Sequence, residues 1–423
     1  MYEALPGTSR DKECYFTDIV LVGCGVAGFT AAKTIKEISP QTEITIFTEE
    51  DYLYYPRPRL YSVLSGQVQP QEIISFSEQW YEKRGIRVFT RKKATRIDVA
   101  NNEVLLQDET RARYDALLMA NGAYPFLPPV KGADKRGVFT LRSLENALAI
   151  RRYAENAKKA VVVGGGLLGL EFAASLRKLG QQVDVVEILP RLLPMQLDQE
   201  GSKIFQSGIE SLGIRVAVGA KTTEILGGEA ASGVSLEDGR TLSGDLILFS
   251  AGIRSNIGLA REAGIKISRG IVVDEHLQTN ISNVYAAGDV AEFKEKVYGI
   301  IPAAEEQAKV AAVNMAGSEK REYKGTIASN TIKIIGVDLT SIGVIEPPGP
   351  EYEEIRKVDP EKRIYKKIVI KQGKIVGAII LGEARAAPFL RRLVEQGVDV
   401  AEFKWEILED DFDYRRLPQV DRP

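Results

Sequence analysis

Residues 18–29 read DIVLVGCGVAGF. The first five are mostly apolar, as in a buried strand, and a G-x-G-x-x-G turn follows them without a gap. Phe29 to Ile38 then has the apolar spacing of a helix, which is expected to end before Pro40. A strand, this glycine turn and a helix in direct succession predict a dinucleotide-binding βαβ unit.

The three glycines of this turn have separate tasks in such a unit. Gly23 permits the tight turn, Gly25 lets the backbone approach a pyrophosphate, and Gly28 lets the helix pack closely on the strand. The helix N-terminus then offers free N–H groups and the positive end of its dipole to the phosphates. The next predicted strand, Ile44 to Thr48, is followed by Glu49, an acid placed to accept hydrogen bonds from the adenosine ribose.

The same pattern occurs a second time later in the chain. An apolar strand at 160–163 precedes the turn GGGLLG at 164–169, and Leu170 to Leu179 has the pattern of a helix. The following strand, Val183 to Val186, again ends in an acid, Glu187. One glycine-rich turn could be an ordinary loop, but two with the same flanking elements predict two dinucleotide-binding folds.

The acid of the second copy bears on the choice of nicotinamide cofactor. A carboxylate at Glu187 would bind a free ribose 2′-hydroxyl and repel a 2′-phosphate, so NADH is expected to be preferred over NADPH. Arg191 follows four residues later and could weaken that exclusion. We interpret Arg191 instead as a solvated surface charge.

Composition excludes several other functions. The 423 residues include 44% apolar and 27% charged side chains, the balance of a soluble globular protein, and the length suggests roughly three domains. Lys and Arg number 56 against 58 Asp and Glu, so no nucleic acid or anionic membrane is expected as a partner. No run approaches the roughly 20 apolar residues of a membrane span, and Met1 to Lys12 lack the apolar core of a signal peptide. With only two cysteines, Cys14 and Cys24, the chain can form neither a disulfide scaffold nor a zinc site, which predicts a cytoplasmic protein. Ser-His-Asp chemistry or a histidine-rich metal site would depend on the single histidine, His276, so both are disfavoured.

Three further motifs carry a family resemblance. Residues 114–123 read YDALLMANGA, with Asn121 in place of the usual Thr of an A-T-G turn, and residues 245–252 read DLILFSAG. Residues 279–289 read TNISNVYAAGD. Together with the two glycine turns, these motifs resemble the flavoprotein reductases with two dinucleotide-binding domains that are related to glutathione reductase. Within that family the chain is most similar to the NADH:rubredoxin reductases and to the flavin-binding portion of NAD(P)H nitrite reductases.

The resemblance implies an α/β fold with two Rossmann-like dinucleotide-binding domains and a C-terminal α+β interface domain. The FAD-binding domain would be discontinuous, at residues 1–142 and 272–318, with the NAD-binding domain, residues 143–271, inserted into it. The interface domain would cover residues 319–423. Its expected elements are strands at 331–335, 364–370 and 374–381, a helix at 386–396, and a solvated tail from Glu406.

The resemblance also implies which residues bind the two cofactors, FAD and NADH, while no metal site is expected. FAD would be bound by Gly23, Gly25, Val26, Ala27, Gly28, Glu49, Arg57, Pro58, Ala94, Ala120, Asn121, Gly122, Gly288, Asp289 and Ala303. NADH would be bound by Gly164, Gly166, Leu167, Leu168, Gly169, Glu171, Glu187 and Gly252.

The implied activity is that of an FAD-dependent NADH:acceptor oxidoreductase, with rubredoxin or ferredoxin, both small iron proteins, as the electron acceptor. The chain lacks the Cys-x-x-x-x-Cys pair and the C-terminal His–Glu pair of the family's disulfide reductases. Ser65 stands where the family's oxidases and peroxidases carry a reactive cysteine. Ser62 replaces a lysine that many ferredoxin-reductase relatives pair with an acid at the position of Glu171, so Ser62 and Glu171 are the candidates for a catalytic role.

Two alternatives stay open, because in this superfamily the group that approaches the flavin sets the function. The chain could be a flavin subunit that admits electrons into a larger redox complex. It could also be an NADH oxidase that reduces O₂. A homodimer is a further option that the sequence leaves open.

Overall fold

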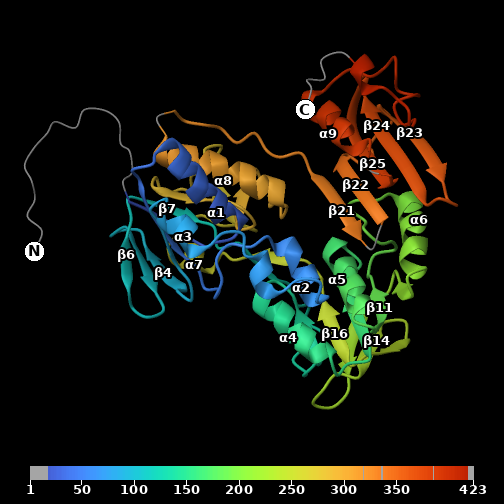
Figure 1. Cartoon of the computed structure of the whole chain (residues 1–423), viewed down its shortest axis with the longest axis horizontal. Coiled ribbons are helices and arrows are strands. Elements are labelled where there is room, and N and C mark those ends of the chain that lie inside the picture. Colours follow the sequence, from blue (N-terminus) through green and yellow to red (C-terminus); the bar gives the residue numbers. More distant parts are fainter. Residues whose placement is uncertain (1–17, 318, 335–336, 384, 418–423) are drawn as a thin grey trace, which may run out of the picture. The chain divides into compact units, whose positions relative to one another are not determined.

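The computed structural model describes residues 18–317, 319–334, 337–383 and 385–417 (Figure 1). The chain forms two compact units. The first unit contains the described residues from Asp18 to Pro56, Ile74–Ala123 and Ser255–Thr326. The second contains Arg57–Ile73, Tyr124–Arg254 and the described residues between Ile327 and Leu417.

The first unit is built on a five-stranded parallel sheet that includes the strand before the first glycine turn. Its central strands are nearly continuous apolar runs, as expected for parallel strands covered on both faces. Helices α1 (Val26–Ile38) and α8 (Ile301–Ala316) pack against each other in this unit. The strand order is β19 (Val284–Ala286), β7 (Ala116–Met119), β1 (Asp18–Val22), β2 (Glu43–Phe47), β3 (Ile86–Phe89).

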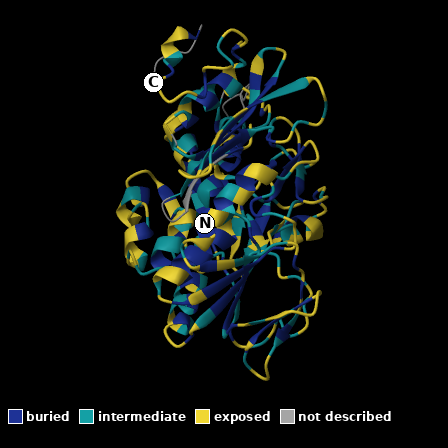
Figure 2. Cartoon of the chain, turned by 90° about the vertical axis from the view of Figure 1, so that its right-hand side faces the viewer, coloured by how far each residue is buried: buried dark blue, intermediate teal, exposed yellow. Residues whose placement is uncertain are grey.

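An antiparallel meander and several short elements complete the first unit. The strands of its sheet belong to one buried core with the helices. Figure 2 colours the chain by burial, with buried residues in dark blue and exposed residues in yellow. The meander consists of β4 (Ala94–Asp98), β5 (Glu103–Leu106) and β6 (Arg111–Arg113); the short elements are α3 (Glu78–Glu82), α7 (Gly258–Glu262), β18 (Ile271–Val273) and β20 (Ala291–Phe293).

The second unit repeats this plan with the second glycine turn. Strand β10 (Lys159–Val163), helix α5 (Leu167–Lys178) and strand β11 (Gln182–Val186) correspond to β1, α1 and β2. The parallel sheet has the order β12-β11-β10-β16-β9. Other elements of this unit include β9 (Val138–Thr140), β12 (Ile214–Ala217), β16 (Leu246–Phe249), α2 (Leu60–Leu64), α4 (Leu144–Ala154), α6 (Gln199–Glu210), β13 (Thr222–Leu226), β14 (Gly233–Leu236) and β15 (Thr241–Ser243).

An antiparallel five-stranded sheet forms the C-terminal part of the second unit, with the order β21-β22-β25-β24-β23. Strands β22 and β23 had no counterpart among the predicted elements. Helix α6 contacts β24 and β25, so this sheet and the nucleotide-type sheet share one unit. The elements are β21 (Ser329–Ile334), β22 (Val337–Gly343), β23 (Tyr352–Asp359), β24 (Ile364–Lys371), β25 (Lys374–Gly382) and α9 (Ala387–Gln396).

The prediction of a solvated tail from Glu406 is wrong for the described residues up to 417. Ile407, Leu408, Phe412 and Leu417 are buried in one cluster with α9 and the C-terminal sheet. The acids that made the segment look solvated neutralise lysines of that sheet, since Lys357 pairs with Glu409 and Lys366 with Asp410. The apolar residues between the charges therefore determine where the segment lies.

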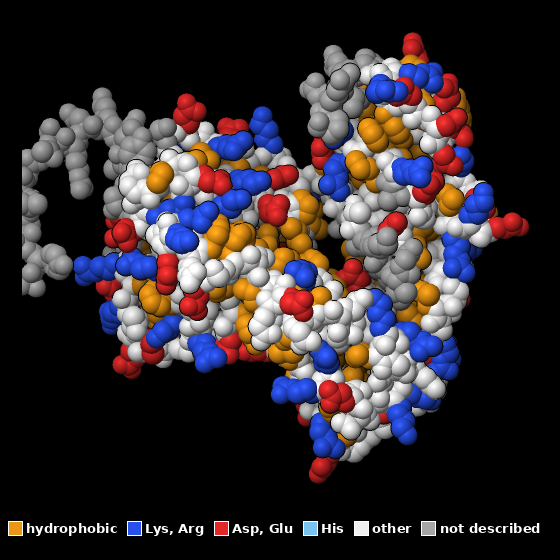
Figure 3. Space-filling view, viewed as in Figure 1, with side chains coloured by type: hydrophobic (Ala, Val, Ile, Leu, Met, Phe, Trp, Pro, Cys, Tyr) orange, Lys and Arg blue, Asp and Glu red, His pale blue; other side chains and the backbone are white. Residues whose placement is uncertain are grey.

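Charged side chains of both signs are interspersed over the face shown in Figure 3. This distribution agrees with the net charge of −2. In the ranges that the structure describes, no helix combines the length and the apolar character needed to cross a membrane.

Candidate cofactor-binding sites

The first glycine turn is tight at two glycines and open at the third. A Cβ on Gly23, which has φ +107°, would lie 2.3 Å from the Ala120 oxygen, and a Cβ on Gly28 would lie 2.0 Å from the Gly23 oxygen. At Gly25, by contrast, no atom lies within 4 Å of the position of a Cβ. Gly25 is the N-cap of α1, whose N-terminus has neither a side-chain cap nor an acid in its first turn. Open space before free N–H groups fits a pyrophosphate.

Segments distant in sequence meet at this turn. The Ala120 N–H donates to the Val22 oxygen over 2.9 Å, which places the A-N-G turn beside the glycine turn. A Cβ on Gly288 would lie 3.0 Å from the Ala27 Cβ, so the motif that ends in Asp289 also reaches the start of α1. Helix α8 is close to the same point: Gln307 accepts the Gly288 N–H over 2.8 Å, and Ala303 is buried in the first turn of this helix.

Asn121 presents an unused acceptor at this meeting point. Its Nδ2 donates to the Asn256 oxygen over 2.8 Å, while its Oδ1 is buried and has no hydrogen-bond partner among the described residues. The adjacent Gly122 has φ +64° and completes the turn. Because a buried acceptor without a donor is costly, this atom fits a site completed by a ligand.

The acid predicted for the ribose also lies at this edge of the sheet. The Gly23 N–H donates to the Phe47 oxygen at the end of β2 over 2.8 Å, and Glu49 follows two residues later. Its carboxylate is exposed and lies 3.4 Å from Lys93 Nζ. Ala94, at the start of β4, is buried.

Arg57 and Pro58 belong to the second unit. There Arg57 donates a hydrogen bond to the backbone oxygen of Arg142. Their assignment to FAD therefore stays a prediction.

Cys24 is buried, and burial raises the pKa of its thiol to about 12, as expected for a packing residue and not for a nucleophile. Cys14 lies outside the described residues.

The second glycine turn reproduces the sterics of the first. A Cβ on Gly164 would lie 2.2 Å from the Ser250 oxygen, and a Cβ on Gly169 would lie 1.9 Å from the Gly164 oxygen. Gly166, the N-cap of α5, again has open space at its Cβ position. Leu167 and Leu168 form the start of α5, and Gly252, with φ +98°, follows β16. A second dinucleotide therefore fits here.

The structure fixes the carboxylate of Glu187 firmly. Its side chain is buried, Oε2 accepts the Gly165 N–H over 2.6 Å, and Oε1 accepts the Leu189 N–H over 2.8 Å. Both oxygens keep lone pairs for a ribose hydroxyl. Burial and these two hydrogen bonds oppose reorientation of the carboxylate.

The interpretation of Arg191 as a solvated surface charge is wrong. Its side chain is 23% exposed and donates hydrogen bonds to the backbone oxygens of Pro194 and Leu197 and to the Glu346 carboxylate. Because Glu346 is distant from Arg191 in the sequence, no local sequence pattern could have predicted the contact between the two side chains.

Glu171 has a partner that the sequence reasoning missed. Where relatives pair this acid with a lysine, Glu171 forms a hydrogen bond with the hydroxyl of Tyr61, the neighbour of Ser62. Helix α2, which carries Ser62, packs on α5, and Ser175 donates to the Tyr61 oxygen over 3.3 Å. Burial raises the pKa of the Glu171 carboxyl to about 7, and the Tyr61 hydroxyl partly offsets this effect.

Glu171 should make stability depend on pH. Its folded-state pKa is raised from 4.5 to about 7, so the native state binds the proton more tightly than the unfolded chain, and stability falls as pH rises through this window. Relative to Glu171→Gln, the native protein should lose up to about 3 kcal/mol of unfolding free energy between these pH values. Denaturant unfolding at a series of pH values measures the difference. In Tyr61→Phe the window should extend to higher pH, because the hydroxyl that stabilises the carboxylate is gone; parallel pH curves for native protein and Glu171→Gln would contradict the assignment.

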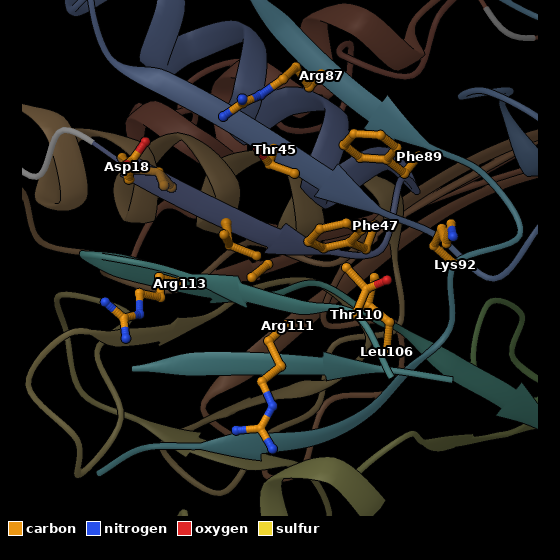
Figure 4. A pocket seen from close by; sticks show the side chains of 13 residues that line it. Asp18, Thr45, Phe47, Arg87, Phe89, Lys92, Leu106, Thr110, Arg111 and Arg113 are labelled. Carbon is orange, nitrogen blue, oxygen red and sulfur yellow. The ribbon is translucent and has the colours of Figure 1, made fainter. Parts of the chain in front are cut away.

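A separate cavity of about 360 Å³ lies between the sheet and the meander of the first unit (Figure 4). Phe47 and Phe89 line it, and their rings stack with centroids 5.5 Å apart. Its basic side chains are paired with acids. Arg87 lies 3.1 Å from Glu43. Lys92 pairs with Asp108, and Arg111 and Arg113 both pair with Glu103. We therefore assign no cofactor to this cavity.

Within the described ranges, no group of three or more His, Cys, Asp or Glu side chains could hold a metal ion.

Comparison with known proteins agrees with the duplicated geometry. The sequence profile of the pyridine nucleotide-disulphide oxidoreductases matches residues 17–308. The chain belongs to the pyridine nucleotide-disulphide oxidoreductase family. A second profile, that of the rubredoxin NAD⁺ reductase C-terminal domain, matches residues 329–398 of the chain. Membership confirms the predicted family, and the solved structures confirm the predicted α/β fold.

Three known proteins show the extent of the similarity. An NAD(P)H nitrite reductase from Bacillus subtilis is 35% identical over 91% of this chain and 48% of its own length. The NADH-rubredoxin oxidoreductase of Clostridium acetobutylicum is 31% identical over 90% of this chain and 94% of its own. The crystal structure of a ferredoxin reductase from Rhodopseudomonas palustris has a TM-score of 0.84 at 27% identity, covering 94% of this chain and 99% of that one. The chain thus spans about half the length of several curated relatives, among them two nitrite reductases and an assimilatory nitrate reductase electron transfer subunit.

Proposed function

We propose that this oxidoreductase transfers hydride from NADH to FAD and passes the electrons on to a small iron protein such as rubredoxin or ferredoxin. The observation that carries the proposal is the duplicated turn, with open space over Gly25 and over Gly166 in front of two uncapped helix N-termini. Bound FAD would supply the chemistry of accepting a hydride and releasing single electrons. Similarity to rubredoxin and ferredoxin reductases supports the class of acceptor.

The residues of the chain would bind and orient the two cofactors. In the first unit, Gly25 and the N-terminus of α1 would hold the FAD pyrophosphate, Glu49 the adenosine ribose, and Asp289 the ribityl chain. In the second, the N-terminus of α5 would hold the NADH pyrophosphate and Glu187 the free 2′-hydroxyl. The remaining residues predicted from the sequence would line the same two sites. We also propose the domain bounds 1–142 with 272–318 for FAD, 143–271 for NADH and 319–423 for the interface domain.

The iron centre of the acceptor would lie outside this chain. Iron–sulfur clusters and rubredoxin-type sites need several cysteine thiolates, and the sequence has two cysteines, of which Cys24 is buried.

A second candidate function is that of an electron-entry module in a larger redox assembly. The observation that favours it is that nitrite reductase relatives extend to about twice the matched length.

Reoxidation of the NADH-reduced protein distinguishes these functions. The FAD-loaded chain is reduced anaerobically with NADH and then mixed with oxidised rubredoxin, oxidised ferredoxin or air. We expect fast transfer to one of the iron proteins and slow transfer to air. Fast reoxidation by air alone would contradict the proposal and indicate an oxidase, and failure with all three would favour the module of a larger assembly.

A further inference from the structure

The loop after Glu187 folds back onto the second glycine turn. The Leu193 N–H donates to the Gly165 oxygen over 3.1 Å. A Cβ on Gly165 would lie 2.6 Å from Leu192 Cδ2 and 2.9 Å from the Glu187 Cβ, so these residues converge on one point. Arg191 immediately precedes this contact. Its backbone is therefore anchored next to the carboxylate expected to select the adenosine ribose.

The guanidinium of Arg191 is directed to other partners. Nε lies 3.2 Å from the Leu197 oxygen, and Nη2 lies 3.2 Å from the Pro194 oxygen and 2.9 Å from Glu346 Oε2. Glu346 follows β22 in the C-terminal part of the second unit. The contact thus couples the interface region to the nucleotide-binding loop.

An arginine beside the adenosine ribose would ordinarily matter for cofactor choice. A guanidinium near the 2′ position can accommodate the 2′-phosphate of NADPH, because it matches the phosphate in charge and in hydrogen-bonding geometry. Here the charge of Arg191 is compensated by a carboxylate, and three of its hydrogen bonds are already used. Two features would then act together against NADPH: the fixed acid at Glu187 and the engaged base at Arg191.

We propose that Glu346 is a specificity-determining residue that holds Arg191 away from the 2′ position and so strengthens the preference for NADH. The inference rests on the proposed use of NADH by this unit. It assigns the C-terminal domain a part in cofactor selection, in addition to its packing role.

Equilibrium binding of NAD⁺ and NADP⁺ to the FAD-loaded protein tests this inference by calorimetry, without any electron acceptor. In Glu346→Gln, the dissociation constant for NADP⁺ should fall by about tenfold, while that for NAD⁺ should change by less than about twofold. NAD⁺ should remain the tighter ligand, because Glu187 is unchanged. The matched control Glu361→Gln removes an exposed acid of the same domain and should alter neither constant.

A double-mutant cycle shows whether Arg191 mediates the effect. Arg191→Gln alone should leave NADP⁺ binding near the native value, since the native guanidinium is engaged elsewhere. Combined with Glu346→Gln, it should abolish the gain. An unchanged NADP⁺ affinity in Glu346→Gln, or a gain that survives in the double variant, would overturn the inference. A native protein that binds neither dinucleotide would instead overturn the proposed function on which it rests.

Discussion

Replacing Gly25 with valine is expected to give a folded chain that no longer retains FAD. The backbone at Gly25, with φ −77° and ψ −170°, is open to any residue, and no protein atom lies within 4 Å of a Cβ built there. The added side chain would instead fill the space in which a pyrophosphate approaches α1. We expect FAD affinity to fall by at least about 100-fold, with loss of NADH-dependent electron transfer. Bound flavin per chain and circular dichroism measure the two effects.

Two further glycines provide matched controls for this result. Gly166→Val makes the equivalent change in the second unit, so this variant should retain FAD and accept electrons from dithionite while losing reduction by NADH. Gly28→Ala, whose Cβ would lie 2.0 Å from the Gly23 oxygen, should misfold the first unit. Full FAD retention in a folded Gly25→Val would refute the placement of FAD at this turn.

Replacing Lys367 with methionine should destabilise the second unit by about 3–5 kcal/mol, because it leaves a buried carboxylate without its cation. Lys367 is 1% exposed, and its Nζ lies 2.9 Å from Asp198 Oδ2 and 3.3 Å from Glu354 Oε1. Asp198 also accepts the Tyr365 hydroxyl over 2.6 Å and caps α6. This buried network joins the C-terminal sheet to α6.

Denaturant unfolding measured side by side with Lys362→Met checks the prediction. Lys362 forms an exposed pair with Asp359, 3.5 Å apart, and its replacement should cost less than about 1 kcal/mol. Equal unfolding free energies for the two variants would show that the buried network contributes no more than a surface pair.

The residues with local signatures were predictable from the sequence. Strand β1 begins and ends as expected, and both glycine turns lie where their spacing places them. The helices begin at Val26 and Leu167, three residues before the predicted starts, because the third glycine of each motif is inside the first helical turn. There its missing side chain allows contact with the turn.

The contacts that depend on tertiary structure were not predictable in this way. Lys367 contacts Asp198, 169 positions away in the sequence, and Arg191 contacts Glu346, 155 positions away. A local sequence pattern therefore cannot predict either pair. Tyr61 reaches Glu171 because α2 packs on α5. The prediction that the tail from Glu406 is solvated was wrong because it rested on the acids of this segment alone. The lysines that pair with these acids lie on β23 and β24, distant in the sequence.

Anaerobic titration of the FAD-loaded protein with NADH, followed by the visible absorbance of the flavin, tests the central claim most directly. If both proposed dinucleotide sites are correct, one NADH should bleach one FAD per chain, and NADPH should act more slowly because of Glu187. A flavin that dithionite reduces and NADH does not would contradict the account.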